Sequence, residues 1–599
     1  AGDDKRGKWQ RFDAMLHSHQ GETGDFASAR LKLLDELTFT LFNRFAAIKV
    51  MEAASMFPPI MTRMVEHGGR SFGHKAWLEI NPDMRGEDLE GIREYIKQAF
   101  DELGETLPLY HKSYPYAFLP DSHSLNEIID AFNAVEKDAQ VGADIWLSDD
   151  VLGWLYESYN EVKKKEFKES KAKTEYDKVS LQSQVYTPRW VVQFLVENSL
   201  GKLYLEMYPG SAIKNKHKIA NAPTKQERES KPLREIKLID PACGSGNFLL
   251  FAFDFFYELY IDQIENHGAE YEENEISKLI IENNLHGVDL DDRAVQIAQL
   301  GLYIKARKKN RRVKDLKFKV VSSDFYLPEY DEVRSIFEAG ANLDQSQKEL
   351  LADIWSDLKF SYKFGSLIQL DARFKARLQK LVAKREQTSG RLFSDEEICS
   401  PPKSPEPIQR ELYVEQAIIE EKEFISEFFK KLKSTVEQYA RSQGSSFLTD
   451  KTRDAIVFLE LLTNSYDVAT ANPPYTDSSD FGPDLKKFIE DNYKKPFGFH
   501  TNLYATFIKR CCDYVSEVGK VAMVHPPTFM YIKTFEDVRK FIIEKTHISF
   551  FVEWGYLGMF NPSARVDSAL YILEKGNNKK KDSCFIKLNH LYETKRYSA

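Results

Sequence analysis

The sequence predicts an α/β fold, with an α-helical domain in front of it and a helical insertion inside it. Two observations carry this prediction. From about residue 236 onward, short apolar segments that end in turn residues alternate with longer segments of helical periodicity. Before about residue 165, apolar residues recur mostly at helical spacing. Strands that alternate with helices are typical of a parallel sheet, because consecutive parallel strands need a crossover connection.

The first domain is predicted over residues 1–170 and is helical. Residues 1 to about 28 are polar and contain glycine, so we expect a frayed lead-in. The run LKLLDELTFTLFNRFAAIKVMEA, residues 31–53, repeats apolar residues at helical spacing and predicts a core helix. Three later segments continue the helical pattern: DLEGIREYIKQAFDEL, SLNEIIDAFNAV and DDVLGWLYESYNEV.

The α/β part is predicted in two halves. Residues 180–326 form the cofactor-binding half, with strand patterns in REIKLID, NNLHGVDL and KFKVVSSDF. Residues 327–460 are charged and helical, with a Pro/Ser-rich stretch at residues 400–409, and predict an insertion. The catalytic half is predicted over residues 461–599, where strands resume in YDVATANPPY, GKVAMVHPP, ISFFVEWGY and DSALYILEK.

Composition excludes several classes of protein. The 599 residues include 83 Lys and Arg against 92 Asp and Glu, a net charge of −9, which excludes a uniformly basic nucleic-acid binder but allows a local basic groove. The 13% aromatic content excludes a disordered chain. The five cysteines show no CxxC spacing, which is evidence against a disulfide framework. No run of about 18 apolar residues occurs and the start AGDDKRGKWQ is polar, so we expect a cytoplasmic protein without a membrane partner.

The motif DPACGSGNF runs from Asp240 to Phe248, between the first predicted strand and its helix. Glycines at 244 and 246 let the chain turn tightly and let a ligand approach the backbone, because no Cβ intervenes. Asp240, at the end of the strand, can accept hydrogen bonds from a cationic amine. The motif lacks the spacing of a dinucleotide-binding loop or a P-loop, and so it favours the amino-acid end of S-adenosylmethionine over a pyrophosphate.

Two acidic residues at the ends of the next strands extend this pattern. Asp289, in GVDLDD, is placed to accept both hydroxyls of a ribose. Asp324, in SSDF, could accept the amino group of an adenine, and Phe325 beside it could stack on the ring. An acidic helix N-cap explains the neighbouring Asp291 or Asp292 equally well, so Asp289 is the better ligand candidate, and an ordinary strand-end turn is the alternative for Asp324.

The motif ANPPY follows the strand at residues 466–469 and contains Asn472, Pro473, Pro474 and Tyr475. A conjugated amino group has two hydrogens, which the Asn472 side-chain oxygen and the Pro473 carbonyl can accept. The prolines stiffen this geometry by fixing φ. The Tyr475 ring can stack on a planar group that has left its helix. Two prolines alone would indicate a turn, but DPACGSG upstream in the same α/β block favours the catalytic interpretation.

Together, DPACGSGNF, GVDLDD, SSDF and NPPY resemble the class I S-adenosylmethionine-dependent amino-methyltransferases, specifically the DNA adenine-N6 group. The segments SQVYTPRWVVQFLVENSLGKLY and NLYATFIKRCCDYVSEVGKVAMVHP extend the resemblance to the PglX family of BREX phage-defence methyltransferases. It covers roughly residues 33–210, 236–326 and 465–575. The resemblance implies a Rossmann-like class I SAM methyltransferase sheet and S-adenosyl-L-methionine as the cofactor.

The resemblance also implies roles for single residues. The segment Tyr186-Thr187-Pro188 would cap the methionine end of the cofactor, and Phe560 would pack against the second face of the flipped base. The residues assigned to the cofactor are Tyr186, Thr187, Pro188, Asp240, Ala242, Cys243, Gly244, Gly246, Asn247, Phe248, Asp289, Leu290, Asp324, Phe325 and Asn472. The residues assigned to catalysis are Asn472, Pro473, Pro474, Tyr475 and Phe560. The resembled proteins are much longer, with a target-recognition domain after this region.

Other chemistries find no support in the sequence. Cys243 lies in the cofactor loop and not in a Pro-Cys motif at the catalytic strand, so it is not a cytosine-C5 nucleophile. No HExxH motif or His/Cys metal spacing occurs, so we expect no metal. No ExK follows Pro82-Asp83 within the reach of a nuclease motif.

We therefore predict a site-specific DNA adenine-N6 methyltransferase that acts on an adenine flipped out of double-stranded DNA, within a BREX-type phage-defence system. Other BREX defence proteins or a phage-encoded inhibitor are the expected protein partners. Two alternatives fit the same motifs. NPPY also serves enzymes that methylate protein or RNA amines, and the fold could serve mainly as a DNA-binding or assembly subunit of a defence complex.

Overall fold

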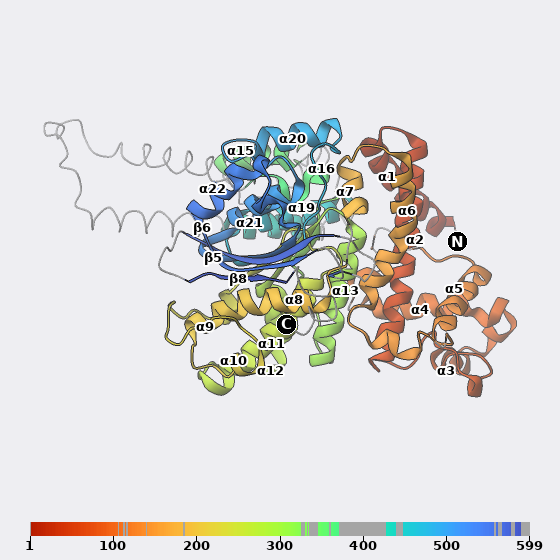
Figure 1. Ribbon diagram of the computed structural model, residues 1–599. Coiled ribbons are helices and arrows are strands. Elements are labelled where there is room, and N and C mark those ends of the chain that lie inside the picture. Colours follow the sequence, from red (N-terminus) through yellow and green to blue (C-terminus); the bar gives the residue numbers. More distant parts are fainter. Residues whose placement is uncertain are drawn as a thin grey trace, which may run out of the picture. The chain divides into compact units, whose positions relative to one another are not determined.

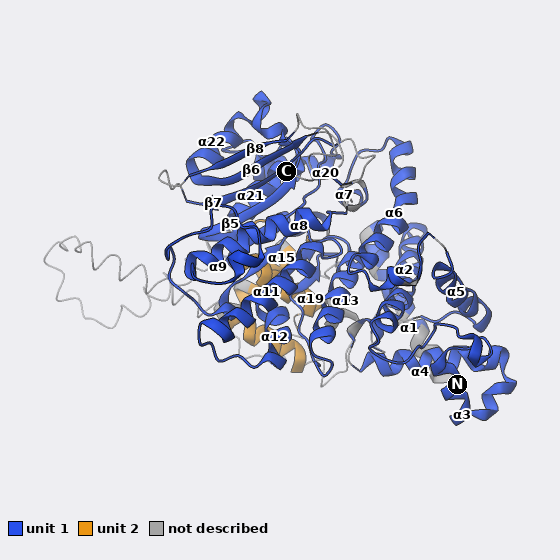
Figure 2. Cartoon of the chain, turned by 60° about the horizontal axis from the view of Figure 1, so that its bottom comes forward, with its two compact units in different colours: residues 1–324, 363–367, 465–599 blue, residues 325–362, 368–464 orange. Residues whose placement is uncertain are grey.

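The computed structural model divides the chain into two compact units (Figure 2). Unit 1 holds residues 1–324, 363–367 and 465–599, and unit 2 holds residues 325–362 and 368–464. The residues that the structure describes are 2–105, 107–111, 114, 118–138, 140–183, 186–324, 330–331, 334, 345–358, 361–370, 427–438, 447–555, 559–560, 566–576 and 582–588.

The N-terminal part of unit 1 is helical, as the periodicity predicts. Its α-helices are α1 (Gly2–Thr23), α2 (Phe26–Ala53), α3 (Phe72–Ile80), α4 (Ile92–Gly104), α5 (Ser122–Val135), α6 (Val151–Ser170) and α7 (Tyr176–Ser183). Helix α2 begins after Asp25, whose carboxylate accepts a hydrogen bond from the Ser28 amide at 2.9 Å. Helix α5 begins in the same way after Asp121. The helix expected at residues 31–53 is confirmed as the larger part of α2.

The frayed lead-in expected for the first residues is wrong, because residues 2–23 form α1. This helix packs along α2 (Figure 1). Met15 is fully buried, and His19 Nε2 lies 3.3 Å from Glu36 Oε2 of α2. The polar composition concealed the helix, since Met15 and His19 are the described side chains that it buries and two buried positions create little apolar periodicity.

An eight-stranded sheet forms the centre of unit 1, in the order β3-β2-β1-β4-β5-β7-β6-β8. The strands are β1 (Leu238–Asp240), β2 (Leu285–Asp289), β3 (Val320–Ser322), β4 (Tyr466–Ala471), β5 (Val515–His525), β6 (Thr546–Gly555), β7 (Ser568–Lys575) and β8 (Cys584–Lys587). Strands β3, β2, β1, β4 and β5 pair in parallel, whereas β7 is antiparallel to both β5 and β6. The predicted α/β sheet is confirmed, and its order adds an antiparallel strand and the edge strand β8.

Helices cover both faces of this sheet (Figure 1). Helix α8 contacts one face at β5 and β7, whereas α21 contacts the other face at β4 and β5. The remaining helices of unit 1 are α8 (Arg189–Val196), α9 (Lys202–Met207), α10 (Ile213–Lys216), α11 (Asn247–Asn266), α12 (Glu273–Leu279), α13 (Asp292–Lys309), α20 (Pro483–Tyr493), α21 (Leu503–Tyr514) and α22 (Glu536–Lys545).

Helix α13 joins two hydrophobic cores. Val295 and Leu302 belong to the core between the sheet and α11, whereas Ile297 and Leu300 belong to the core of the N-terminal helices. All four side chains are at most 3% exposed. Because α13 directly follows β2, this packing holds the N-terminal helices close to the strand end that carries Asp289.

Unit 2 is helical where the structure describes it. It contains α15 (Gln345–Leu358) and α19 (Phe447–Thr463), and α16 (Ser361–Phe364) spans its boundary with unit 1. The Pro/Ser-rich stretch at residues 400–409 lies outside the described residues. Residues 363–367, which fall inside the predicted insertion, group with unit 1 instead.

The strand order locates the ligand crevice. From β1 the chain continues to β2 and β3 on one side, and β4 and β5 lie on the other side of β1. Loops that leave neighbouring parallel strands in opposite directions open a crevice at the carboxyl ends of those strands. The loops after β1, β2 and β4 carry DPACGSG, GVDLDD and NPPY, so these three motifs meet at one edge of the sheet.

Candidate active site

The loop after β1 turns sharply into α11. Asp240 is 1% exposed, and its Oδ1 accepts a hydrogen bond from the Ala242 amide at 3.1 Å. Gly244 and Gly246 have φ values of +52° and +89°, which other residues rarely adopt. A Cβ at Gly246 would lie 2.8 Å from the Ala298 Cβ, so this glycine lets α11 pack closely on α13. A Cβ at Gly244 would meet no atom within 4 Å, because Gly244 borders open space.

Asp289 ties the end of β2 to that loop. Its Oδ2 accepts a hydrogen bond from the Gly244 amide at 2.8 Å, and its Oδ1 accepts one from the Asp291 amide at 2.9 Å. Burial raises the pKa of Asp289 to about 6, although these two amides oppose the rise. Burial also raises the pKa of Asp240, and repulsion from Asp289 adds to that effect. Two carboxylates in one buried site favour a ligand with cationic or hydroxyl donors.

Asn472, just after β4, is held by one side chain from its own loop and one from a distant part of the chain. Its Nδ2 donates to Thr187 Oγ1 at 2.9 Å, and its Oδ1 accepts a hydrogen bond from the Tyr475 hydroxyl. The same hydroxyl lies 3.3 Å from the Val524 carbonyl oxygen on β5. These partners orient the amide, with its nitrogen toward Thr187 and its oxygen as the acceptor. The Tyr475 ring lies near Phe560, with 6.5 Å between ring centroids and 50° between planes.

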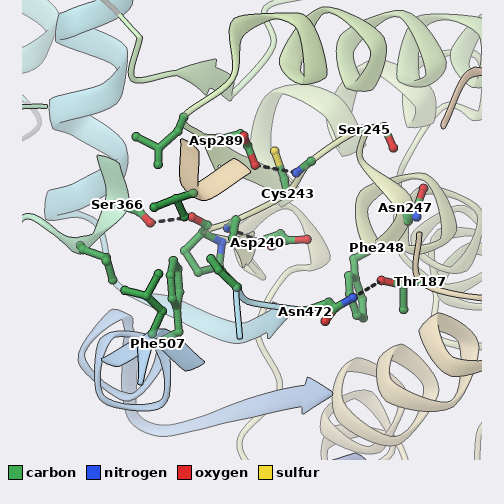
Figure 3. Close-up of a pocket in the computed structure, with 18 of the residues that line it drawn as sticks. Thr187, Asp240, Cys243, Ser245, Asn247, Phe248, Asp289, Ser366, Asn472 and Phe507 are labelled. Carbon is green, nitrogen blue, oxygen red and sulfur yellow. Dashed lines mark hydrogen bonds between the residues drawn. The ribbon is translucent and has the colours of Figure 1, made fainter. Parts of the chain in front are cut away.

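The three loops border a cavity of about 150 Å³ (Figure 3). In the figure, Asp240, Asp289 and Asn472 surround this space from three strand ends, and Thr187 approaches Asn472 from a separate segment. The predicted site residues that line the cavity are Tyr186, Thr187, Asp240, Ala242, Cys243, Gly244, Asn247, Phe248, Asp289, Leu290, Asn472 and Pro474.

Some predicted site residues do not line the cavity. Asp324, predicted to bind an adenine amino group, pairs instead with α2, and both of its carboxylate oxygens lie 3.2 Å from Lys32 Nζ. Its role in cofactor binding stays a prediction. Phe325 lies outside the described residues. The other predicted residues absent from the lining are Pro188, Gly246, Pro473, Tyr475 and Phe560.

The cavity also has walls that the motifs did not indicate. They come from α6, α7, residues 363–367, α20 and α21, and two more lining residues belong to DPACGSGNF but were not singled out there. The lining residues not named from the sequence are Gly153, Tyr156, Glu157, Val179, Pro241, Ser245, Lys363, Phe364, Ser366, Leu367, Leu485, Leu503 and Phe507. Helical periodicity could have shown that the α6 residues share a face, but it could not have shown what that face contacts.

Residues 363–367 form a strap across the loop after β1. The Ser366 hydroxyl donates to the Pro241 carbonyl at 2.5 Å (Figure 3). The Ser366 carbonyl accepts hydrogen bonds from Arg510 Nε and from the Tyr514 hydroxyl, each at 2.8 Å. Arg510 is fully buried, so the strap is anchored in the protein interior and not only on its surface.

Among the residues that the structure describes, no group of three or more His, Cys, Asp or Glu side chains is arranged to hold a metal ion. Within the same residues, no helix combines the length and apolar character needed to cross a membrane.

The sheet order and the three motif-bearing loops define a methyltransferase-like domain, and comparison with known proteins agrees. Residues 283–560 match the Eco57I restriction-modification methylase family, and residues 216–341 match the DNA-methyltransferase domain of MmeI. These matches include the ends of β2 and β4 together with Asp240, and so they contain the loops described above.

Two adenine-specific methyltransferases are similar to most of the chain. BrxX of Escherichia coli O9:H4 (strain HS) is 25% identical over 577 residues, which cover 86% of this chain and 42% of BrxX. PglX of Lacticaseibacillus casei (strain Zhang) is 24% identical over 566 residues, which cover 86% of this chain and 41% of PglX. The chain thus spans about two fifths of the length of these relatives. Its similarity to both relatives and the match of residues 283–560 to the Eco57I family confirm the resemblance predicted from the motifs.

Among solved structures, the Type ISP restriction-modification enzyme LlaGI, in complex with a DNA substrate mimic, has a TM-score of 0.44 and 12% identity. That match covers 100% of this chain and 35% of LlaGI. Because the TM-score is low, the fold is assigned from the strand order of the sheet itself.

Proposed function

We propose that this chain is the catalytic part of a DNA adenine-N6 methyltransferase that uses S-adenosylmethionine. The observation that carries the proposal is the position of Asn472 on the wall of the cavity that Asp240 and Asp289 also line. A methyl donor held by the two carboxylates would present its methyl group beside the Asn472 amide. An amino group bound at Asn472 would then share the cavity with that methyl group.

The cavity residues fit S-adenosylmethionine by their chemistry. The Asp289 carboxylate accepts hydrogen bonds from two backbone amides and has further lone pairs that can accept hydrogen bonds from two ribose hydroxyls. Asp240 can accept hydrogen bonds from the ammonium group, whose charge would lower the pKa that burial raises. When bound, S-adenosylmethionine supplies a methyl group activated by its sulfonium.

The Asn472 site fits a flipped adenine. Asn472 Oδ1 and the Pro473 carbonyl would accept the two hydrogens of the adenine N6 amino group. Oδ1 already accepts a hydrogen bond from the Tyr475 hydroxyl, and its second lone pair can accept a hydrogen from the base. The Val524 carbonyl, 3.3 Å away, offers the hydroxyl another acceptor. The Tyr475 and Phe560 rings would then provide aromatic contacts for the base outside its helix.

The proposed methyl transfer needs no covalent enzyme intermediate. S-adenosylmethionine, held by Asp240 and Asp289, would supply its methyl group directly to N6; sulfur would keep the electrons of the broken bond, and one amino proton would leave to solvent. Asn472 and Pro473 contribute by holding both amino hydrogens, because this directs the nitrogen lone pair at the methyl group.

We infer the substrate and the partners of this chain from its relatives. Two homologues are named adenine-specific methyltransferases, which supports adenine as the target base. We place the reaction on double-stranded DNA within a BREX-type defence system. Other defence proteins of that system, or a phage-encoded inhibitor, would be its protein partners.

Replacing Asn472 tests the function. The variant Asn472→Ala should lower methyl transfer to duplex DNA by about 100-fold or more, because the amino group loses its orientation. Calorimetry should show cofactor affinity close to that of the wild type. Asn492→Ala, on α20 and outside the cavity lining, is the matched control and should retain activity.

Three outcomes would contradict the proposal. They are undiminished methylation of DNA by Asn472→Ala, transfer of labelled methyl groups to protein or RNA in place of DNA, and cofactor binding without any turnover. Sequencing of methylated bases in cells that carry the wild type or Asn472→Ala would then identify the modified base.

A further inference from the structure

One face of α6 reaches the cavity from the N-terminal helices. Gly153, Tyr156 and Glu157 lie three and four positions apart, so they share this face, and all three line the cavity. Gly153 has no room for a side chain, because a Cβ there would lie 2.6 Å from a ring carbon of Tyr186. Helix α6 is therefore a wall of the cavity itself.

Direct hydrogen bonds connect α6 to the turn that carries Asp289. The Tyr156 hydroxyl donates to Asp291 Oδ2 at 2.7 Å, and the Asp291 amide donates to Asp289 Oδ1 at 2.9 Å. Arg293 joins the same turn to α2, where its Nη1 donates to Asp35 Oδ2 at 2.8 Å. These contacts set the position of the α6 face relative to Asp289.

Glu157 is the acidic residue on this face. Its carboxylate is partly buried and accepts a hydrogen bond from the Tyr186 backbone amide. Burial raises the pKa of Glu157, while the Tyr186 amide and the charge of Lys164 lower it. Tyr186 precedes Thr187, whose hydroxyl accepts the hydrogen bond from Asn472. Glu157 thus lies beside the segment that orients the Asn472 amide.

The charge of the cavity lining indicates what kind of group Glu157 would bind. The charged residues of the described lining are Glu157, Asp240, Asp289 and Lys363. Lys363 Nζ is paired with Asp484 at 2.9 Å. The lining therefore carries excess negative charge, which favours a cationic group in the ligand.

The order of the ligand's parts places that cationic group. In S-adenosylmethionine the ribose and the amino-acid part extend from opposite sides of the sulfonium. With the ribose at Asp289 and the methyl group at Asn472, the amino-acid part would lie against the remaining lining, which includes Glu157 and the Tyr186–Thr187 segment. That segment contacts Glu157 through the Tyr186 amide.

We propose that Glu157 binds the α-ammonium group of S-adenosylmethionine, together with Asp240. This inference rests on the proposed function. An ammonium group has three hydrogens, so it can donate to both carboxylates at once. Each such bond is charge-assisted, and the partly buried surroundings strengthen it relative to water. The N-terminal helices then contribute a side chain that binds the cofactor, in addition to supporting the fold.

Calorimetry with two ligands tests the proposal. S-adenosylhomocysteine keeps the ammonium group, whereas 5′-methylthioadenosine lacks the whole amino-acid part. Glu157→Gln should weaken binding of S-adenosylhomocysteine about tenfold, the loss expected for one charge-assisted hydrogen bond, and should leave 5′-methylthioadenosine within about twofold. The control is Glu161→Gln, one turn further along the same side of α6 but exposed and outside the cavity lining, which should change neither affinity.

Each other result has a separate meaning. Equal weakening of both ligands, or no weakening of either, would overturn the role of Glu157 while leaving the proposed function intact. Failure of the wild type to bind either ligand would overturn the proposed function instead. Thermal unfolding of Glu157→Gln serves as the folding check, and Glu157→Asp, if Gln unfolds the protein, should weaken S-adenosylhomocysteine selectively.

Discussion

Thr187 accepts a hydrogen bond from the Asn472 side-chain amide at 2.9 Å, although the two residues are 285 positions apart in the sequence. The contact joins the segment before α8 to the loop after β4. The bond from Nδ2 to Thr187 fixes the rotation of the amide, so Oδ1, its acceptor, faces the Tyr475 hydroxyl and would face a substrate amino group. A residue outside the NPPY motif therefore decides which end of the Asn472 amide faces the reaction.

Thr187→Val tests this orientation. Valine keeps the shape of threonine but cannot accept the hydrogen bond, so the Asn472 amide loses its fixed direction. We expect the single-turnover rate of methyl transfer to fall about tenfold, which corresponds to about 1.4 kcal/mol of lost positioning. Cofactor affinity should change less than the rate. Thr187→Ser keeps the hydroxyl and should restore most of the rate, and equal rates for Val and Thr would remove Thr187 from this role.

The two motif glycines should fail in different ways when replaced. Gly246→Ala forces a Cβ within 2.8 Å of the Ala298 Cβ at a φ of +89°, so we expect the free energy of unfolding to fall by at least about 2 kcal/mol. Gly244→Ala meets no neighbour, and we expect a smaller loss of about 1 kcal/mol from its φ of +52°.

The same pair separates stability from cofactor binding. Gly244 lines the cavity, so its added methyl group would occupy ligand space and weaken cofactor binding about tenfold or more. Gly246 does not line the cavity, and folded Gly246→Ala should bind the cofactor almost normally. Denaturant titration and calorimetry on both variants measure the two effects, and matching profiles for the two variants would contradict the assignment.

Much of the fold was predictable because its strands end in recognisable turn residues. The ends of β1, β2 and β4 were located from Asp240, Asp289 and Asn472. The antiparallel direction of β7 could not be predicted, since the residue pattern of a strand carries no information about which strands it pairs with. Helix α1 was missed for a related reason, because periodicity detects a broad apolar face and α1 has little of one.

The sequence predicts the candidate site only where a motif itself contains the residue that would contact the ligand. Tyr156 reaches Asp291 across 135 positions, and the Ser366 hydroxyl reaches Pro241 across 125. Such contacts depend on how helices and segments pack in three dimensions, and the local sequence around Tyr156 and Ser366 does not show which residues they contact. Asp324 shows the opposite case, in which a recognisable motif position is engaged by Lys32.

Cofactor binding should depend on pH through Asp289. The pKa of this carboxyl is raised by burial to about 6, so it is protonated below that pH. Two ribose hydroxyls bind best to the ionised carboxylate. We therefore expect cofactor affinity to fall about tenfold per pH unit below pH 6 and to level off above it. Because bound cofactor favours ionisation, binding near pH 6 should release protons.

Calorimetry in two buffers of different ionisation enthalpy measures that release. Asp240, whose pKa burial also raises, adds to the total, and Glu157 faces the same cavity. Comparison with Asp289→Asn therefore isolates the part due to Asp289. For stability without ligand the sign is opposite. The raised pKa of Asp289 makes its contribution to the free energy of unfolding fall as pH rises from 3.8 to about 6. Equal proton release by wild type and Asp289→Asn would refute the assignment.

The strap at residues 363–367 should control how well the cavity holds its ligand. Ser366→Ala removes the hydroxyl that donates to the Pro241 carbonyl at 2.5 Å, but it keeps the Ser366 carbonyl that accepts from Arg510 and Tyr514. The strap would stay anchored at one side and loosen at the loop after β1. We expect cofactor affinity to fall about fivefold, the loss of about 1 kcal/mol from one neutral hydrogen bond, with little change in thermal stability.

The control for this prediction is Ser434→Ala, an exposed serine in unit 2 whose hydroxyl bonds only within its own helix among the contacts described. It should leave both affinity and stability unchanged. If Ser366→Ala binds the cofactor as tightly as the wild type, the strap borders the cavity without supporting the loop after β1. If it loses stability and affinity together, the hydroxyl serves folding, and the separate role in ligand binding is wrong.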